Sequence, residues 1–131
     1  MKSAADVVST MLDGVKKEDA AAVLACIDKD LVCIEPASLP YGGEHRGLEA
    51  FKNNVLGVLM GRLIIKFGRC ELLGSGDKVA ASMDLTFTSR KTGNSIMMPY
   101  VEVYTCRNDK VVHLDVYPQD TQRLVEFLSA N

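Results

Sequence analysis

The sequence predicts an α+β fold in which helices pack on one face of a curved antiparallel sheet. Three observations support this prediction. Apolar residues recur with helical spacing up to about residue 60, they alternate with polar residues from residue 62 onward, and no repeat or linker divides the 131 residues. A chain of this length builds one hydrophobic core. We therefore expect residues 1–131 to form a single domain.

Three helices are expected before most of the sheet. Apolar residues at i, i+3, i+4 and i+7 predict an amphipathic helix over residues 3–15, and a shorter helix is expected over residues 18–28. A strand over residues 31–35 then runs into a loop rich in proline and glycine. Helical spacing resumes after this loop and predicts a third helix over residues 48–60.

Four strands and a short helix are expected in the second half. In the first strand, which starts at Arg62, the apolar positions change parity at Gly68, and this predicts a β-bulge. The last two strands are joined through a tight hairpin at residues 107–110, and Asp120 is placed to cap a final helix. The three strands after the bulged one are expected over residues 79–88, 96–106 and 111–117.

Charge and composition exclude several classes of protein. Fifteen Lys and Arg residues against seventeen Asp and Glu residues give a net charge of −2, and the basic residues are scattered. A nucleic-acid-binding protein needs a concentrated positive surface, so no nucleic-acid partner is expected. The N-terminus lacks the apolar core of a signal peptide, and no run of eighteen apolar residues could span a bilayer. We expect a cytoplasmic protein that does not associate with membranes.

The four cysteines are widely spaced within apolar segments, which is typical of reduced thiols in a core. No Cys-x-x-Cys motif is present and the chain has only two histidines, so no metal site and no cofactor are expected. The cysteines are Cys26, Cys33, Cys70 and Cys106.

Two motifs give the order of elements a resemblance to a known family. Ile34-Glu-Pro36 ends the first strand, and Tyr41-Gly-Gly-Glu-His-Arg-Gly-Leu-Glu-Ala-Phe51 leads into the third helix. Together with the layout from Val8 to Tyr117, they resemble the nuclear transport factor 2-like superfamily, and within it the SnoaL-like polyketide cyclases and ketosteroid isomerases. The resemblance implies a cystatin-like cone, in which the curved sheet wraps around the helices and encloses a pocket that opens at one end.

The resemblance also implies roles for two carboxylates. The acid before the proline at the end of the first strand is the general base in the isomerases, and here it is Glu35. A second acid on the next-to-last strand donates a hydrogen bond to the developing enolate, and matching the hairpin places it at Glu102. The family's tyrosine on the first helix is replaced near Met11. A carboxylate in an apolar wall loses hydration and gains proton affinity; the alternative for Glu35 is a solvent-exposed strand end.

The register of the last hairpin decides which face Glu102 takes. A loop of three residues places Glu102 across from Leu114, whereas two or four residues place it across from Asp115. In the second register Glu102, Asp115 and His113 share a face with Tyr100, Tyr104 and Tyr117. Plain alternation instead places Val101 and Val103 in the core, opposite Val112, Leu114 and Val116, and leaves Glu102 facing outward. Both placements stay open from the residues alone, and Asp115 is a third candidate catalytic group.

Other side chains are expected to line the pocket. Tyr41, between Pro40 and two glycines, either donates a hydrogen bond to a bound oxygen or packs over a helix end. The methionines fit an adaptable apolar lining, although each fits a core position equally well. The candidate ligand-binding residues are Tyr41, Met60, Met83, Phe87, Met98, Tyr100 and Tyr104.

These expectations describe a protein that carries out acid–base chemistry on a small molecule. The resemblance implies a hydrophobic substrate with a carbonyl or epoxide group and a reaction of the isomerase, cyclase, dehydratase or hydrolase type, with no cofactor. The alternative is a non-catalytic ligand-binding or dimeric interaction module of the same fold, since this fold hosts both. A homodimer formed through the outer face of the sheet is expected.

Overall fold

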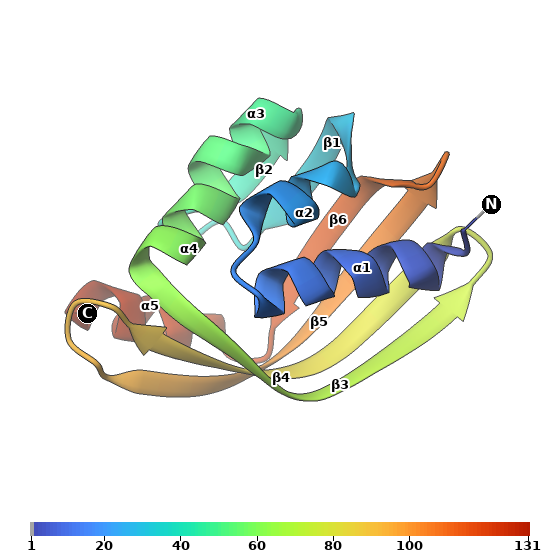
Figure 1. The fold of residues 1–131 in the computed structure, drawn as a ribbon. Coiled ribbons are helices and arrows are strands. Elements are labelled where there is room, and N and C mark those ends of the chain that lie inside the picture. Colours follow the sequence, from blue (N-terminus) through green and yellow to red (C-terminus); the bar gives the residue numbers. More distant parts are fainter. Residues whose placement is uncertain (1) are drawn as a thin grey trace.

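The computed structural model describes residues 2–131, and its helices and strands form two layers (Figure 1). Helices α1 and α2 and the long helical segment that ends in α4 lie over the concave face of one curved sheet. The helical elements are α1 (Ala4–Lys16), α2 (Ala20–Ala25), α3 (Leu48–Phe51), the π-helical turn η1 (Lys52–Leu56), α4 (Gly57–Arg62) and α5 (Thr121–Ala130). The strands are β1 (Ile27–Glu35), β2 (Gly43–Arg46), β3 (Leu63–Ser75), β4 (Lys78–Ser89), β5 (Ser95–Arg107) and β6 (Lys110–Pro118).

The first helix begins at a capping box, which satisfies backbone N–H groups that have no partner within the helix. The Ser3 hydroxyl accepts a hydrogen bond from the Asp6 N–H at 3.0 Å, and the Asp6 carboxylate accepts one from the Ser3 N–H at 3.3 Å. Val7, Val8 and Met11 lie on the buried face of α1. The predicted amphipathic helix is therefore confirmed. The second helix is shorter than expected, because residues 27 and 28 already belong to β1.

The third predicted helix runs from Leu48 to Arg62 and contains one π-helical turn. A π-helical turn contains one more residue than a regular α-helical turn, and such turns are frequent at functional sites. Phe51 and Val55 follow helical spacing, and the extra residue also turns Leu56 inward, so that all three are buried. The helix therefore presents a broad apolar face to the sheet.

The sheet has the strand order β2-β1-β6-β5-β4-β3, and most of its pairs are antiparallel. The exception is the pair of β1 with β6, which is parallel. The expected curved antiparallel sheet is confirmed, apart from this one pair. Strand β2 lies in the segment predicted to be a loop; Gly43, its first residue, and Gly47, which follows its last, have φ angles of 91° and 92°. Its four residues pair with the end of β1.

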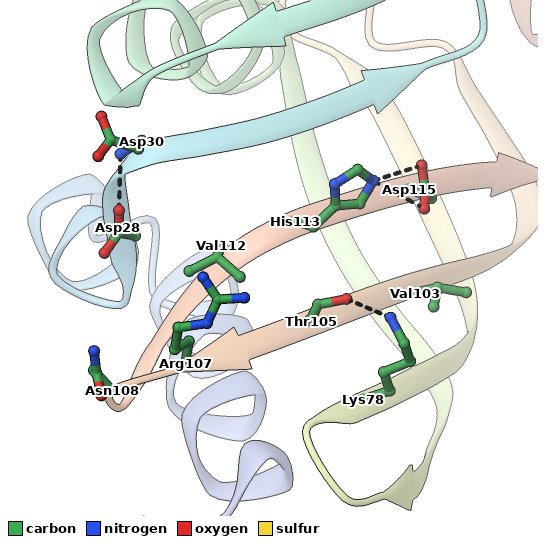
Figure 2. A pocket seen from close by; sticks show the side chains of 10 residues that line it. All are labelled: Asp28, Asp30, Lys78, Val103, Thr105, Arg107, Asn108, Val112, His113 and Asp115. Carbon is green, nitrogen blue, oxygen red and sulfur yellow. Dashed lines mark hydrogen bonds and ion pairs between the residues drawn. The ribbon is translucent and has the colours of Figure 1, made fainter.

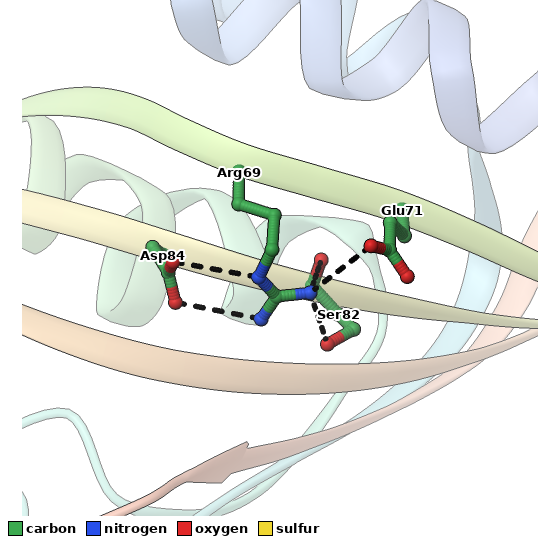
Figure 3. Close-up of polar contacts among 4 residues, drawn as sticks. All are labelled: Arg69, Glu71, Ser82 and Asp84. Atoms are coloured by element: carbon green, nitrogen blue, oxygen red, sulfur yellow. Dashed lines mark hydrogen bonds and ion pairs between the residues drawn. The ribbon is translucent and has the colours of Figure 1, made fainter.

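The predicted bulge in β3 is confirmed, since its register against β4 shifts between Phe67 and Cys70. On the outer face beside this bulge, Arg69 bridges the two strands (Figure 3). Its guanidinium donates to the Ser82 hydroxyl at 2.9 Å and lies 3.4 Å from the Asp84 carboxylate. These contacts hold the bent strand against its neighbour on the side away from the helices.

A second bulge lies in the last hairpin and was not predicted. Asn108 and Asp109 form the tight turn with φ angles of 52° and 61°, as a two-residue hairpin loop requires. Cys106 pairs with Val111, but Thr105 pairs with His113. Val112 is therefore the extra residue, and every pair beyond it moves by one position.

The described residues also settle the expectations about the thiols and the final helix. Each of the four cysteines carries a free thiol; Cys70 is half-buried and the other three are buried. Asp120 caps α5 by accepting a hydrogen bond from the Arg123 N–H at 3.0 Å. Within residues 2–131, no helix is long and apolar enough to cross a membrane.

Candidate functional site

A cavity of about 80 Å³ lies between the helices and the inner face of the sheet. Its wall is almost entirely apolar, and the polar groups in it come from β1, the loop after β1, and β5. The lining residues are Met11, Leu12, Val15, Val23, Glu35, Tyr41, Phe51, Val55, Leu56, Leu59, Met60, Ile65, Phe67, Met83, Leu85, Phe87, Tyr100, Glu102, Tyr104, Leu114 and Val116.

Glu35 faces the cavity because it continues the inward-facing positions of β1. Leu31 and Cys33 precede it on the same face and are fully buried. Glu35 is only 6% exposed, and its Oε1 atom has no hydrogen-bond partner among residues 2–131. Burial, and next the charge of Glu102, raise the pKa of Glu35 from its ordinary 4.5 to about 9. Glu35 is therefore protonated at neutral pH.

Tyr41 reaches the cavity from a tightly folded loop after Pro36. The Leu39 N–H donates to the Pro36 carbonyl at 3.1 Å, and the Gly42 N–H donates to the Leu39 carbonyl at 2.9 Å. A Cβ atom on Gly42 would lie 2.2 Å from the Pro36 carbonyl oxygen, so this close approach requires glycine. The His45 ring lies 2.9 Å from the Tyr41 carbonyl oxygen and fixes the end of the loop.

The Tyr41 hydroxyl resembles the Glu35 carboxyl in its surroundings. Tyr41 is 3% exposed, and its Oη atom has no hydrogen-bond partner in the described part of the chain. Burial, and then the nearby Glu35, raise the pKa of this phenol, while the neighbouring Tyr100 hydroxyl acts in the opposite direction without meeting the geometry of a hydrogen bond. Buried polar atoms are nearly always paired with protein, water or a ligand. Two such atoms beside one cavity therefore indicate a place for a polar group of a bound molecule.

Glu102 differs from Glu35 because it has a hydrogen-bond donor. The Tyr104 hydroxyl donates to its Oε1 atom at 2.6 Å. Burial raises the pKa of Glu102, and this hydrogen bond partly opposes that rise because it favours the charged form. Burial, and then the charge on Glu102, raise the pKa of Tyr104. The phenol therefore stays protonated and available as a donor.

The two glutamates lie in one row across the sheet. Glu102 of β5 pairs with Val116 of β6. On the other side of β6, Ile34 pairs with Asp115, so the next residue, Glu35, lies level with Val116. Neighbouring strands are about 4.8 Å apart, which places the two glutamate Cα atoms about 10 Å apart. Both side chains line the same cavity from opposite sides of Val116.

Because of the bulge at Val112, neither of the two registers predicted for the last hairpin is found. Glu102 lies across from Val116, not across from Leu114 or Asp115. Because the turn has two residues, simple counting pairs Glu102 with Asp115, and the extra residue moves that partner by one. The inner face of β5 therefore carries Tyr100, Glu102 and Tyr104, all of which line the cavity.

Asp115 lies on the opposite face of the sheet from the cavity, which contradicts its predicted place in the pocket. It lines an open depression of about 690 Å³ on the outer face, with His113 beside it (Figure 2). The His113 Nε2 atom lies 3.2 Å from an Asp115 carboxylate oxygen. Asp115 is therefore too far from the cavity to act with Glu35 on one ligand.

Most of the predicted lining residues reach the cavity. Met60, Met83 and Phe87 do so, but Met98 is fully buried in the core and does not line it. Met11 lies in the wall, at the helix position where the resemblance places a tyrosine in other members. Sequence reasoning missed Leu114 and Val116, because the second bulge changes which residues of β6 face inward.

The described residues contain no group of three or more His, Cys, Asp and Glu side chains that could hold a metal ion. The polar groups of the cavity are two carboxyls and three phenols. This set can donate, accept and transfer protons next to a bound molecule.

Sequence and structure comparisons place the fold among known proteins. Residues 8–114 match the profile of the SnoaL-like domain. No curated protein matches the sequence significantly. A nuclear transport factor 2-like protein from Burkholderia thailandensis superposes with a TM-score of 0.84 at 24% identity, and the alignment covers 100% of this chain and 99% of that protein.

Two further solved structures carry more specific descriptions. A proposed polyketide cyclase from Xanthomonas campestris superposes with a TM-score of 0.82 at 16% identity, over 94% of each chain. TerC, crystallised with polyporic acid, superposes with a TM-score of 0.81 at 18% identity, over 96% of this chain and 98% of its own. At these identities the similarity establishes the fold.

Proposed function

Because the chain belongs to the SnoaL-like domain family, we propose that its cavity binds a small hydrophobic molecule with a carbonyl or epoxide oxygen, and that Glu35 and Glu102 exchange protons with it. The reaction is of the isomerase, cyclase, dehydratase or hydrolase type and needs no cofactor. One observation carries the proposal: an otherwise apolar cavity contains two buried oxygen atoms, Glu35 Oε1 and Tyr41 Oη, that lack hydrogen-bond partners.

The chemistry follows from the surroundings of these groups. A carboxyl group in an apolar cavity has a pKa shifted toward the range in which it both gives and takes protons. A donor aimed at a developing negative oxygen can lower a barrier by several kcal/mol. Tyr41 and the two glutamates supply both functions. The polyketide cyclase description of one neighbour and the polyporic acid bound to another favour an oxygen-rich organic ligand.

The test starts from a ligand found by screening carbonyl and epoxide compounds for an increase in melting temperature. Turnover of the hits is then measured for the wild-type protein and for Glu35→Gln. We expect Glu35→Gln to reduce kcat by at least about 100-fold, the range for loss of one acid–base group. The exposed Glu49→Gln is the matched control and should retain activity. Unchanged turnover in Glu35→Gln would refute the proposal.

A second candidate function is a non-catalytic ligand-binding module. The observation that favours it is the cavity volume of about 80 Å³, since pockets for drug-sized ligands are typically about 300–1,000 Å³. A module of this kind would bind a compound tightly without changing it, and Glu35→Gln would alter affinity alone. Product analysis after prolonged incubation separates this candidate from an enzyme.

We also propose that two copies associate through the outer face of the sheet. Val101, Met97 and Tyr117 expose large apolar side chains on this face. Beside them, the depression in Figure 2 carries both basic and acidic groups, among them Arg107 and Asp30. A surface that carries both signs of charge can pair its basic groups with the acidic groups of a second copy across a two-fold axis, as a symmetric dimer requires.

A further inference from the structure

We propose that the two glutamates have divided roles, in which Glu102, held by Tyr104, is the proton acceptor, while neutral Glu35 and Tyr41 together donate to a substrate oxygen. This inference rests on the function proposed above and assigns a substrate class to the same cavity. It reverses the roles that the family resemblance implies, in which Glu35 is the base and Glu102 the donor.

The hydrogen bonds of the cavity support the assignment of Glu102. The Tyr104 hydroxyl has one proton, and its hydrogen bond goes to Glu102 Oε1 at 2.6 Å. A carboxylate accepts this proton without rearrangement, and a hydrogen bond to a charged group is stronger than one between neutral groups. Tyr104 is fully buried, so water does not compete for the contact. Burial opposes a charge on both glutamates, but only Glu102 has a donor that offsets this cost, so the negative charge is favoured at Glu102 over Glu35.

Glu35 has the opposite surroundings. Its Oε1 atom is buried without a donor in the described chain, and burial leaves almost no contact with solvent. An ionised carboxylate there would be neither solvated nor paired, which is costly. Burial raises the pKa of Glu35 to about 9, and the charge on Glu102 acts in the same direction. Glu35 is the neutral member of the pair, and a neutral carboxyl group is a hydrogen-bond donor.

The remaining walls do not change this division. The titratable groups that face the cavity are Glu35, Tyr41, Tyr100, Glu102 and Tyr104. Helices α1 and α2 and the segment from α3 to α4 contribute only apolar side chains to the lining. Since no basic side chain among residues 2–131 lines the cavity, the position of Tyr104 decides which glutamate carries the negative charge.

This division selects a class of substrate. The molecule needs an acceptor oxygen for Glu35 and Tyr41, and an acidic C–H for Glu102 on the other side of Val116. An enolisable carbonyl compound satisfies both conditions. The C–H bond breaks and its proton moves to Glu102, the electron pair forms the C=C bond, and the carbonyl oxygen takes the proton of Glu35. The products of this step are an enol, neutral Glu102 and ionised Glu35. Glu102 then gives its proton to a different carbon of a conjugated enol, and the enol O–H returns its proton to Glu35, so an isomer of the substrate is released and both glutamates regain their resting charges.

Infrared spectra of protein labelled with ¹³C at the glutamate carboxyl carbons test the resting charges without any substrate. Glu35→Gln and Glu102→Gln assign the signals of the two groups. At pH 7 we expect Glu35 to absorb as a neutral carboxyl and Glu102 as a carboxylate. The reverse assignment, or two neutral carboxyls, would overturn the proposal, and this measurement does not depend on any tyrosine variant.

Tyr104→Phe tests the positioning role. Loss of one hydrogen bond to a charged group should raise the titration midpoint of Glu102 by about one to two pH units. Tyr100→Phe, which removes another buried phenol of the same strand face, is the matched control and should leave that midpoint in place. An unshifted Glu102 signal in a folded Tyr104→Phe protein would refute the role of Tyr104.

These readouts separate the two proposals. If the charges are as expected but no carbonyl compound is converted, the proposed function fails while the division of charge stands. If turnover needs both glutamates but Glu35 is the ionised group at rest, the proposed function stands and the division is wrong.

Discussion

Burial of Glu35 makes the stability of the protein depend on pH. In the unfolded chain the carboxyl ionises above its ordinary pKa of 4.5, whereas in the folded protein it stays neutral up to about pH 9. The folded state thus holds a proton that the unfolded state releases, so the contribution of this group to stability is complete below pH 4.5 and is lost as pH rises toward 9. By pH 7 the loss amounts to about 3 kcal/mol.

Glu35→Gln should remove this dependence. Urea denaturation of the variant between pH 5 and 9 is expected to give a flatter profile of unfolding free energy, and the variant should be more stable than the wild type at pH 8. Glu49→Gln, at an exposed site, should reproduce the wild-type slope. Parallel profiles for wild type and Glu35→Gln would contradict the burial argument.

At the level of single residues, the family resemblance led us to expect Glu35 in the pocket, whereas spacing alone left a solvent-exposed strand end open. In the structure Glu35 follows Leu31 and Cys33 in strict alternation on the inward-facing side of β1. Lining residues are harder to predict, because a buried position and a cavity position have the same apolar pattern. Met83 and Met98 are both fully buried, yet only Met83 borders the cavity.

The loop between β1 and β2 is the element that brings Tyr41 to Glu35, and Gly42 is its most constrained residue. An added Cβ would lie 2.2 Å from the Pro36 carbonyl oxygen, a backbone atom that cannot turn aside as a flexible side chain would. Gly42→Ala should therefore destabilise the protein by about 1–3 kcal/mol, as overpacking does. It should also weaken binding of any cavity ligand, because the loop must move and Tyr41 moves with it.

Gly61→Ala is the control for this prediction. Gly61 lies in α4, and a Cβ there would meet nothing within 4 Å. Alanine in a helix is favoured over glycine by about 0.5–1 kcal/mol, so this variant should be slightly more stable than the wild type. Urea denaturation of both variants checks the contrast. Equal effects of the two substitutions would show that the Gly42 contact is unimportant.

The two β-bulges show where element-level prediction stops. The bulge in β3 contains a glycine at the point where the apolar positions change parity, so the sequence marks it. The bulge in β6 contains Val112, a residue that also fits a regular strand. Counting from the turn therefore gives the wrong partner for Glu102. The parallel pairing of β1 with β6 was missed for a related reason, since it joins strands that are far apart in the sequence.

At the scale of the whole molecule, the sheet separates two chemically different faces. The inner face and the helices enclose the apolar cavity, whereas the outer face exposes Val101, Tyr117 and Met97 beside the charged depression. Val101 and Tyr117 are 38% and 57% exposed, and they are directly paired across β5 and β6. Together they form a contiguous apolar surface, a feature that marks interaction sites.

If two copies meet on this face, Val101→Asp should dissociate them. Near a two-fold axis the substitution brings two carboxylates into a desolvated contact, at a cost of about 3 kcal/mol, which corresponds to roughly a 100-fold weaker Kd. Ser9→Asp adds the same charge at an exposed position of α1, on the helical side of the molecule, and should leave the dimer intact. Analytical ultracentrifugation over a range of concentrations measures both. A wild-type protein that sediments as a monomer at all concentrations would show that the outer face is not a dimer interface. A Val101→Asp protein that stays dimeric would show the same, because a carboxylate buried there without a partner must weaken any association that covers it.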